Sequence, residues 1–317
     1  MLSAECEVRT KHRARSTDHL STARPHFTIP LPGRAPLELG SRTLVMGILN
    51  VTPDSFADGG LHFDLDRAVE AGIRMAADGA DIIDVGGEST RPGAGTLPQD
   101  EEWRRVLPVI ERLARQVTLP ISIDTYKAGV ARAAIERGAT IINDISGLQY
   151  DDALGAVAAA TGAALILMHT RGRSSGMYDL AVYEDAAREV RDELAEAIAR
   201  AERAGVSRDA IIVDPGLGFA KRAEHTYTTL AQLASLATLG RPILSGPSRK
   251  SFLAVALGER APHEREWGTA AAVTASVLFG AHIVRVHGVR EMVDVVRVSD
   301  RILAADTAAS TAAKDAG

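Results

Sequence analysis

Eight short apolar runs recur along the chain, and each is followed at once by a residue whose side chain can hydrogen-bond or ionise. The first four runs are Leu44–Leu49 before Asn50, Asp81–Ile83 before Asp84, Pro120–Ile123 before Asp124, and Thr140–Ile142 before Asn143. The last four are Ala164–Met168 before His169, Ala210–Val213 before Asp214, Pro242–Leu244 before Ser245, and His282–Val286 before His287. Continuous apolar runs of this length are typical of strands that are buried on both faces of a parallel sheet.

Stretches with helical periodicity separate these runs. In residues 65–78 and 183–204, charged side chains alternate with Ala, Leu, Ile and Val at the spacing of an amphipathic helix. Strand followed by helix, repeated eight times, predicts an α/β protein with a (β/α)8 TIM barrel. A doubly wound open sheet is the alternative, but it would gather its polar strand ends at one crevice, whereas here every strand delivers one.

Three segments lie outside this repeat. Residues 27–39 alternate apolar and polar side chains around Pro30 and Gly33, which predicts an amino-terminal β-hairpin that caps the bottom of the barrel. Residues 1–25 are rich in Arg, Ser and Thr and poor in large apolar side chains, so they are predicted to be a disordered tail. The barrel is expected to span residues 26–306, with a second disordered tail at 307–317.

Composition narrows the class of protein. A single barrel domain accommodates most of the 317 residues, since such barrels take about 250 residues. The formal net charge is −5 with no block of like charge, which argues against nucleic acid or a membrane surface as the partner. Cys6 is the single cysteine, so an intramolecular disulfide and a cysteine-based zinc site are excluded. These features favour a cytoplasmic enzyme that acts on small molecules.

The loops after the apolar runs are rich in Gly, Pro and polar residues. The longest follow the first and second runs, at Asn50–Gly60 and Asp84–Gly93, and shorter ones lie at Asp214–Phe219 and Gly246–Phe252. The carboxyl ends of barrel strands surround one mouth, where barrel enzymes place their active sites. The polar residues of these loops are therefore predicted to form a single site.

Seven strand-end motifs, in this order, resemble those of the bacterial, single-function dihydropteroate synthases of the pterin-binding family. They begin at Asn50, Asp84, Asp124, Asn143, Asp214, Gly246 and Arg285, and the resemblance covers residues 27 to about 305. It implies condensation of 6-hydroxymethyl-7,8-dihydropterin pyrophosphate with para-aminobenzoate to give 7,8-dihydropteroate and pyrophosphate, a step of folate biosynthesis. It also implies Mg2+ as cofactor and inhibition by sulfonamides.

The pterin ring presents a flat edge of N–H, NH2 and carbonyl groups. A carboxylate such as Asp214 can accept two parallel hydrogen bonds from this edge, an amide such as Asn143 can both donate and accept, and Lys250 can donate to the ring carbonyl. The resemblance implies that Asp124 contacts the ring and stabilises positive charge on the methylene carbon. It further implies pterin contacts from Ile145, Met168, Gly246 and Phe219.

The diphosphate requires cations and oriented donors. Barrel enzymes often bind phosphate at the loops after strands 7 and 8, which here supply Arg285 and His287. The resemblance adds Asn50 and Thr90 to the pyrophosphate site and makes Asn50 a ligand of Mg2+. A hard cation held mainly by phosphate oxygens and waters needs few protein ligands.

Para-aminobenzoate brings a carboxylate and a weakly basic amine. Ser248 precedes a helix-like run at 252–257, so its hydroxyl and the first N–H groups of the helix are predicted to bind the carboxylate, with help from Arg249. The aromatic ring is expected to pack against Phe56 and Pro92, with polar contacts from Thr90 and Arg91. Catalysis is assigned to four residues that order the substrates and stabilise charge, and none of them acts as a nucleophile. They are Asp124, Lys250, Arg91 and Thr90.

Some positions depart from the family pattern or remain outside it. Gly288 stands where Asp is common, which puts a partner of the phosphate site in doubt, and Pro247 stands where Thr, Val or Ala is frequent. His169 and His225 are expected to pack or cap rather than catalyse. Residues 268–280 carry no charge, which predicts a buried helix and, through it, a homodimer.

Two other functions remain as alternatives. A methyltransferase that passes a methyl group from a folate to a corrinoid protein could use the same pterin-binding barrel. Because it handles no diphosphate, it would lack Ser248, Arg249 and Lys250 and the pair Arg285 and His287, all of which are present here. A catalytically silent paralogue would bind a pterin without turnover. Such a paralogue would be expected to have lost a residue of the loops after the first, second or seventh strand, and none is missing here.

Overall fold

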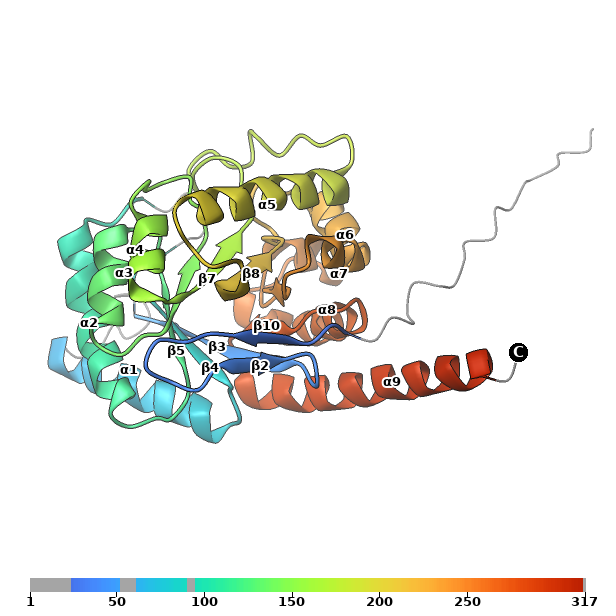
Figure 1. Cartoon of the computed structure of the whole chain (residues 1–317), viewed down its shortest axis with the longest axis horizontal. Coiled ribbons are helices and arrows are strands. Elements are labelled where there is room, and N and C mark those ends of the chain that lie inside the picture. The colour runs from blue at the N-terminus through green and yellow to red at the C-terminus, as the bar shows by residue number, and fades with distance from the viewer. Residues whose placement is uncertain (1–23, 52–60, 90–94, 316–317) are drawn as a thin grey trace, which may run out of the picture.

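Eight parallel strands form a nearly closed barrel, as the sequence predicted (Figure 1). The computed structural model describes residues 24–51, 61–89 and 95–315. The strands pair in the order β8-β7-β6-β5-β4-β3-β10-β9, and a parallel bridge between Val213 and Ile243 joins the two ends of the sheet. The strands are β3 Leu44–Asn50, β4 Ile82–Gly86, β5 Ile121–Asp124, β6 Ile141–Asp144, β7 Ala164–Met168, β8 Ile211–Asp214, β9 Leu244–Ser245 and β10 Ile283–Val286.

Helices surround the barrel in the alternating order that the sequence predicted. They are α1 Leu61–Ala77, α2 Gln99–Ala114, α3 Ala128–Ile135, α4 Leu154–Thr161, α5 Ala186–Arg203, α6 Ala223–Ala231, α7 Ala254–Leu257, α8 Glu266–Leu278 and α9 Val289–Asp315. The helix predicted at 183–204 begins at Ala186, because the Asp185 side chain caps it by accepting a hydrogen bond from the backbone N–H of Arg188. Helix α9 continues past residue 306, where the barrel was expected to end, and leaves the body of the molecule (Figure 1). Within the described ranges no helix is long and apolar enough to cross a membrane.

Alternation along each strand decides which side chains enter the barrel. Successive strand residues point to opposite faces, so in β3 Leu44 and Met46 face inward while Val45 packs outward against helices. In β8, Ile212 belongs to the inner cluster and Ile211 and Val213 to the outer one. The same period places five polar strand residues on the inner face at the mouth. They are Asp84, Asp124, Asn143, Asp214 and Arg285.

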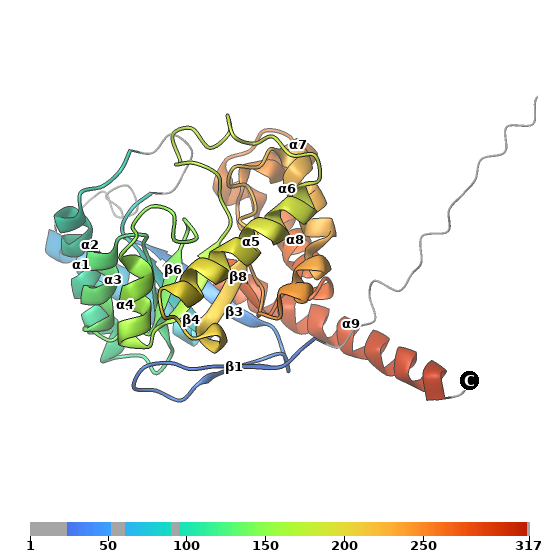
Figure 2. The same cartoon turned by 45° about the horizontal axis from the view of Figure 1, so that its top comes forward.

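The predicted hairpin is present and fills the opposite end of the barrel. Strands β1 Phe27–Ile29 and β2 Leu37–Leu39 pair antiparallel. Ile29, Leu31 and Leu39 are buried in the same apolar cluster as the inner residues of the barrel. In Figure 2 the hairpin lies below the strands, and the loops that follow the strands lie above them. The hairpin therefore seals the amino-terminal end and leaves one mouth for a site.

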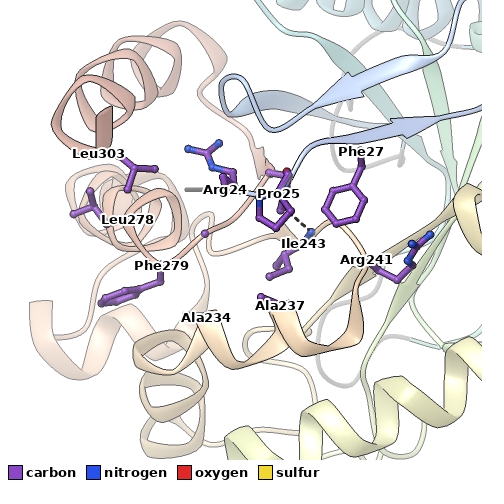
Figure 3. A pocket seen from close by; sticks show the side chains of 12 residues that line it. Arg24, Pro25, Phe27, Ala234, Ala237, Arg241, Ile243, Leu278, Phe279 and Leu303 are labelled. Carbon is purple, nitrogen blue, oxygen red and sulfur yellow. Dashed lines mark hydrogen bonds between the residues drawn. The ribbon is translucent and has the colours of Figure 1, made fainter. Parts of the chain in front are cut away.

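A small cavity of about 50 Å³ lies at the sealed end (Figure 3). Its walls include Phe27 of β1, Ile243 before β9 and His282 before β10, so it lies at the amino ends of the strands. His282 Nε2 is hydrogen-bonded to the carbonyl of Pro25 over 3.1 Å, which joins the start of the described chain to the barrel. The strand-end polar residues lie at the other end of the barrel, so this cavity is separate from the candidate active site.

The uncharged helix predicted at 268–280 is α8, and the chain itself covers most of it. Seven of its residues are buried, and it packs along α9. Burial within one chain therefore accounts for the absence of charge. The side chain of Trp267, in the first turn of α8, remains 85% exposed.

Candidate active site

Arg285 connects the strand-end carboxylates at the mouth of the barrel. From the inner face of β10, its Nε donates a hydrogen bond of 2.6 Å to Asp84 Oδ2, and its Nη2 donates one of 2.7 Å to Asp124 Oδ2. Asn143 of β6 donates from Nδ2 to the same Oδ2 of Asp84 over 3.0 Å. The structure thus brings together residues from four strands that the sequence placed at strand ends.

Asp84 is a site residue to which the sequence analysis gave no role. It is fully buried, and its Oδ2 accepts from both Arg285 and Asn143. Its position at a strand end was the available signal, because an inward carboxylate at that level of the barrel must face the other inward polar residues. Asp84 fixes the orientation of both partners.

A second group of residues lies where the loops after β8 and β9 meet. The Lys250 ammonium lies 3.7 Å from the centre of the Phe219 ring, in a cation–π contact. Asp214 Oδ1 accepts a hydrogen bond of 2.7 Å from the backbone N–H of Gly216. The other oxygen, Oδ2, faces Gly246. A Cβ added at Gly246 would lie 4.0 Å from that oxygen, in ordinary van der Waals contact, so Gly246 lies directly beside the carboxylate.

Burial shifts the pKa values of these groups. Burial raises the pKa of Asp124 to about 7, although Arg285 opposes the shift. Burial lowers the pKa of Lys250 to about 8, with a further contribution from Arg285. The pKa of Asp214 is also raised by burial. Burial acts to lower the pKa of Arg285, but Asp84 and Asp124 raise it more, so this guanidinium stays charged.

An apolar cluster lines the mouth beside these polar groups. Ile145 and Met168, both predicted pterin contacts, pack there with Phe219. Tyr126 and Tyr150 complete the cluster, with their rings 5.2 Å apart and nearly perpendicular. The sequence analysis missed both tyrosines, because they lie in loops one or more residues beyond the strand ends. A flat ring can pack against such a surface while its polar edge meets carboxylates and amides.

The helix-like run predicted at 252–257 is present as η4 Ser251–Leu253 followed directly by α7 Ala254–Leu257. Ser248 lies before this run, with Arg249 and Lys250 between it and Ser251. The Ser248 hydroxyl is buried and lies 2.9 Å from Nδ1 of His287. Ser248 thereby connects this loop to the residue predicted to bind phosphate. Its role toward para-aminobenzoate stays a prediction.

A buried hydrogen-bonded chain supports the loop after β8. The Lys221 ammonium lies 2.7 Å from His169 Nδ1 and donates to the carbonyls of Gly216 and Phe219, each over 3.1 Å. His169 Nε2 in turn lies 2.9 Å from Glu193 Oε2. Three acceptors match the three N–H donors of an ammonium, so His169 accepts at Nδ1 and carries its proton at Nε2. His169 has the structural role that the sequence analysis expected of it.

For the remaining predicted site residues, the structure shows a position only, or the residue lies outside the described ranges. Asn50 ends β3 next to Gly86 of β4, at the level of the mouth. Four lie outside the described residues, namely Phe56, Thr90, Arg91 and Pro92. In the parts of the chain that the structure describes, no group of three or more His, Cys, Asp or Glu side chains could hold a metal ion.

The fold and this mouth define a TIM-barrel enzyme with a buried polar site for a flat, polar-edged ligand. A family model described as pterin binding enzyme matches residues 46–287. The chain belongs to this family of pterin-binding enzymes.

Individual relatives agree with this assignment. The chain is 46% identical over 286 residues to the dihydropteroate synthase of Synechocystis, and the match covers 90% of this chain and 99% of that protein. Among solved structures, the dihydropteroate synthase of Xanthomonas albilineans with 4-aminobenzoic acid is 42% identical, with a TM-score of 0.80 over 87% of this chain and 98% of that one. The Yersinia pestis enzyme with a sulfonamide drug complex is 40% identical, with a TM-score of 0.81 over 88% and 99% of the two chains.

Proposed function

We propose that this chain is a dihydropteroate synthase. It joins 6-hydroxymethyl-7,8-dihydropterin pyrophosphate to para-aminobenzoate and releases pyrophosphate. The observation that carries this proposal is the convergence of Asp124, Asn143, Asp214, Lys250 and Arg285 at one mouth. Relatives that share this barrel over nearly their whole length bear that enzyme name.

The pterin is proposed to lie between the apolar cluster and the buried polar groups. Asp214 keeps one oxygen beside Gly246 for the N–H and NH2 edge of the ring, and Asn143 can donate to it or accept from it. Lys250 donates to the ring carbonyl from its place over Phe219. Because Asp214 and Asn143 are buried, their hydrogen bonds with the ring are stronger than they would be in water.

The reaction exchanges one bond for another at the methylene carbon. The C–O bond to the diphosphate breaks, the amine nitrogen of para-aminobenzoate forms the new C–N bond, and the amine loses a proton. Asp124, as a carboxylate, stabilises the positive charge that develops on the methylene carbon, while Arg285 and His287 stabilise the charge of the departing diphosphate. The enzyme thus acts by ordering its substrates and by electrostatic stabilisation.

Mg2+ is proposed as the cofactor. The described residues offer no cluster of carboxylates for it, which fits an ion held mainly by the oxygens of the diphosphate and by waters. Asn50, at the end of β3, would supply one protein ligand. When bound, the ion neutralises charge on the leaving diphosphate.

The para-aminobenzoate site is proposed to include Ser248 and Arg249, together with Phe56, Pro92, Thr90 and Arg91. Sulfonamides are proposed to bind at the same place, because they present an aromatic amine and an acidic group at similar spacing. The Yersinia pestis relative, solved with a sulfonamide drug complex, supports this choice.

We further propose a cytoplasmic homodimer. Four large apolar side chains are strongly exposed on neighbouring elements: Val255 of α7, Trp267 of α8, and Val298 and Ile302 of α9. A second copy of the chain would bury them by a symmetric contact.

The proposed reaction is tested by product identification. The purified protein is incubated with both substrates and Mg2+, and the product is analysed by mass spectrometry. A mass equal to 7,8-dihydropteroate supports the proposal. A protein that binds the pterin substrate but forms no such product would instead be the silent paralogue.

A further inference from the structure

Glu266 lies against the loop that carries Ser248, Arg249 and Lys250. This residue begins α8, and its Oε2 accepts a hydrogen bond of 2.9 Å from Nε of Arg249. Its other oxygen, Oε1, is buried and has no hydrogen-bond partner in the described part of the chain. A carboxylate with one oxygen engaged and the other enclosed is held by its surroundings rather than placed freely at the surface.

The start of α8 holds Arg249 at three points. The backbone N–H of Arg249 donates to Thr269 Oγ1 over 3.0 Å, and its carbonyl accepts from Arg265 Nη1 over 3.1 Å. The bond between Nε and Glu266 is the third. Arg249 has a φ of 59°, in the left-handed region, and such a backbone persists only where the surrounding structure enforces it. The first turn of α8 and Arg265 before it therefore fix how this arginine is presented.

Gly288 provides the space for this carboxylate. It follows His287 after β10, and its φ is not left-handed, so the backbone does not require glycine here. A Cβ at this position would collide with Oε1 of Glu266 and would lie 3.3 Å from its Cδ and 3.1 Å from Oε2 of Glu291. A larger residue at 288 therefore requires the Glu266 carboxylate, which is bonded to Arg249 through its other oxygen, to shift.

We infer that Glu266 is a positioning residue for para-aminobenzoate, and that the absence of a side chain at Gly288 provides the space for the Glu266 carboxylate. Glu266 fixes the Nε side of the Arg249 guanidinium, so that the terminal nitrogens are already ordered to meet the carboxylate of para-aminobenzoate. An arginine without this partner would have to lose side-chain freedom when the substrate binds, which weakens binding. This inference rests on the proposed function.

The first test is Glu266→Gln, which keeps the shape of the side chain and removes its charge. We expect the KM for para-aminobenzoate to rise about five- to tenfold, while kcat and the KM for the pterin substrate stay within about twofold. Glu291→Gln is the matched control, because this carboxylate also lies near Gly288 but makes no contact with Arg249; it should leave all three constants unchanged. An unchanged or lowered KM for para-aminobenzoate in Glu266→Gln would overturn the inference, as would equal losses for both substrates.

The second test couples the two positions. Gly288→Ala should raise the KM for para-aminobenzoate in the otherwise wild-type chain, but it should add nothing in a Glu266→Ala background, where the space is empty. Independent, multiplying effects would contradict the inference. If Gly288→Ala alone fails to fold, the comparison of the double variant with Glu266→Ala still decides. Turnover by the wild type is measured first, so that a failure of the proposed function is recognised separately.

Discussion

At the scale of single residues, Arg285 balances the charge of the mouth. It donates to Asp84 and Asp124 at once, and Asn143 holds Asp84 from the other side. Lys250 is a second, half-buried cation of the mouth. Nearby Asp214 acts to raise the pKa of Lys250, but burial and Arg285 lower it to about 8. In the proposed reaction, the diphosphate would share Arg285 with these two carboxylates.

Lys250 can be tested directly. Lys250→Ala removes a half-buried cation that contacts Phe219 and opposes the charge of Asp214, so kcat/KM for the pterin substrate should fall by at least about 100-fold. Arg260→Ala removes an exposed cation ten residues further along the chain and should have little effect. Steady-state kinetics measure both. Wild-type kinetics in Lys250→Ala would show that the pterin site is assigned wrongly.

The pKa shifts predict a bell-shaped pH dependence. Asp124 must be a carboxylate to stabilise positive charge, so activity should be lost as the pH falls below its pKa of about 7. Lys250 must be an ammonium to donate to the pterin carbonyl, so activity should be lost as the pH rises above its pKa of about 8. The profile of kcat/KM reports the free enzyme and measures both limbs. A flat profile between about pH 6 and about pH 9 would contradict these roles.

The residues of the mouth were predictable from the sequence, but their contacts were not. Asp124, Asn143, Asp214 and Arg285 follow from the rule that inward residues at the carboxyl ends of strands surround one site. The hydrogen bond of Arg285 with Asp84 depends on the pairing of β10, the last strand of the chain, with β3, the first barrel strand. No local sequence pattern predicts this pairing. The hydrogen bond between Ser248 and His287 depends on how the loops after the paired strands β9 and β10 pack against each other, which local sequence does not show either.

At the scale of elements, the apolar runs predicted the strands well. The structure of the loops between strands and helices was less predictable. A strand that is buried on both faces needs a continuous apolar run, so its position can be predicted from the sequence. The run predicted at 252–257 is present, but it divides into a 3-10 turn, η4, and a short α-helix, α7, which composition does not reveal. Helix α8 was read correctly as buried, but composition does not tell burial within a chain from burial between chains.

Lys221 connects the loop after β8 to His169, which follows β7, and this connection can be tested by mutation. Lys221→Met keeps the volume but leaves His169 Nδ1 and two backbone carbonyls without their donor, at about 1–3 kcal/mol each. We expect the melting midpoint to fall by about 5–10 °C and the KM for the pterin substrate to rise. Arg222→Met, the exposed neighbour, is the control for loss of one charge. Equal melting midpoints for the two variants would show that the buried chain is dispensable.

At the scale of the whole molecule, the barrel has one closed end and one open end. The hairpin fills the amino-terminal end with Ile29, Leu31 and Leu39, so the ligand must approach from the carboxyl ends of the strands. The hairpin could be predicted because alternation and turn residues are local signals. The length of α9 was not predicted, since its last turns are rich in Ala and Thr and carry few large apolar side chains.

The proposed dimer is tested by light scattering. The wild type should have the mass of two chains, and Trp267→Glu should shift it toward one chain, because a charge would then have to be buried in the contact. Leu180→Glu is the control, since Leu180 is also exposed but lies in the loop after β7. A wild type that remains monomeric at micromolar concentration would end the proposal.

The most direct test of the central claim is the dependence of pyrophosphate release on the second substrate. The protein is mixed with 6-hydroxymethyl-7,8-dihydropterin pyrophosphate and Mg2+, and release is followed with and without para-aminobenzoate. A dihydropteroate synthase should release one pyrophosphate for each dihydropteroate formed, and release should require para-aminobenzoate. The same rate without para-aminobenzoate, or no release in either mixture, would contradict the account.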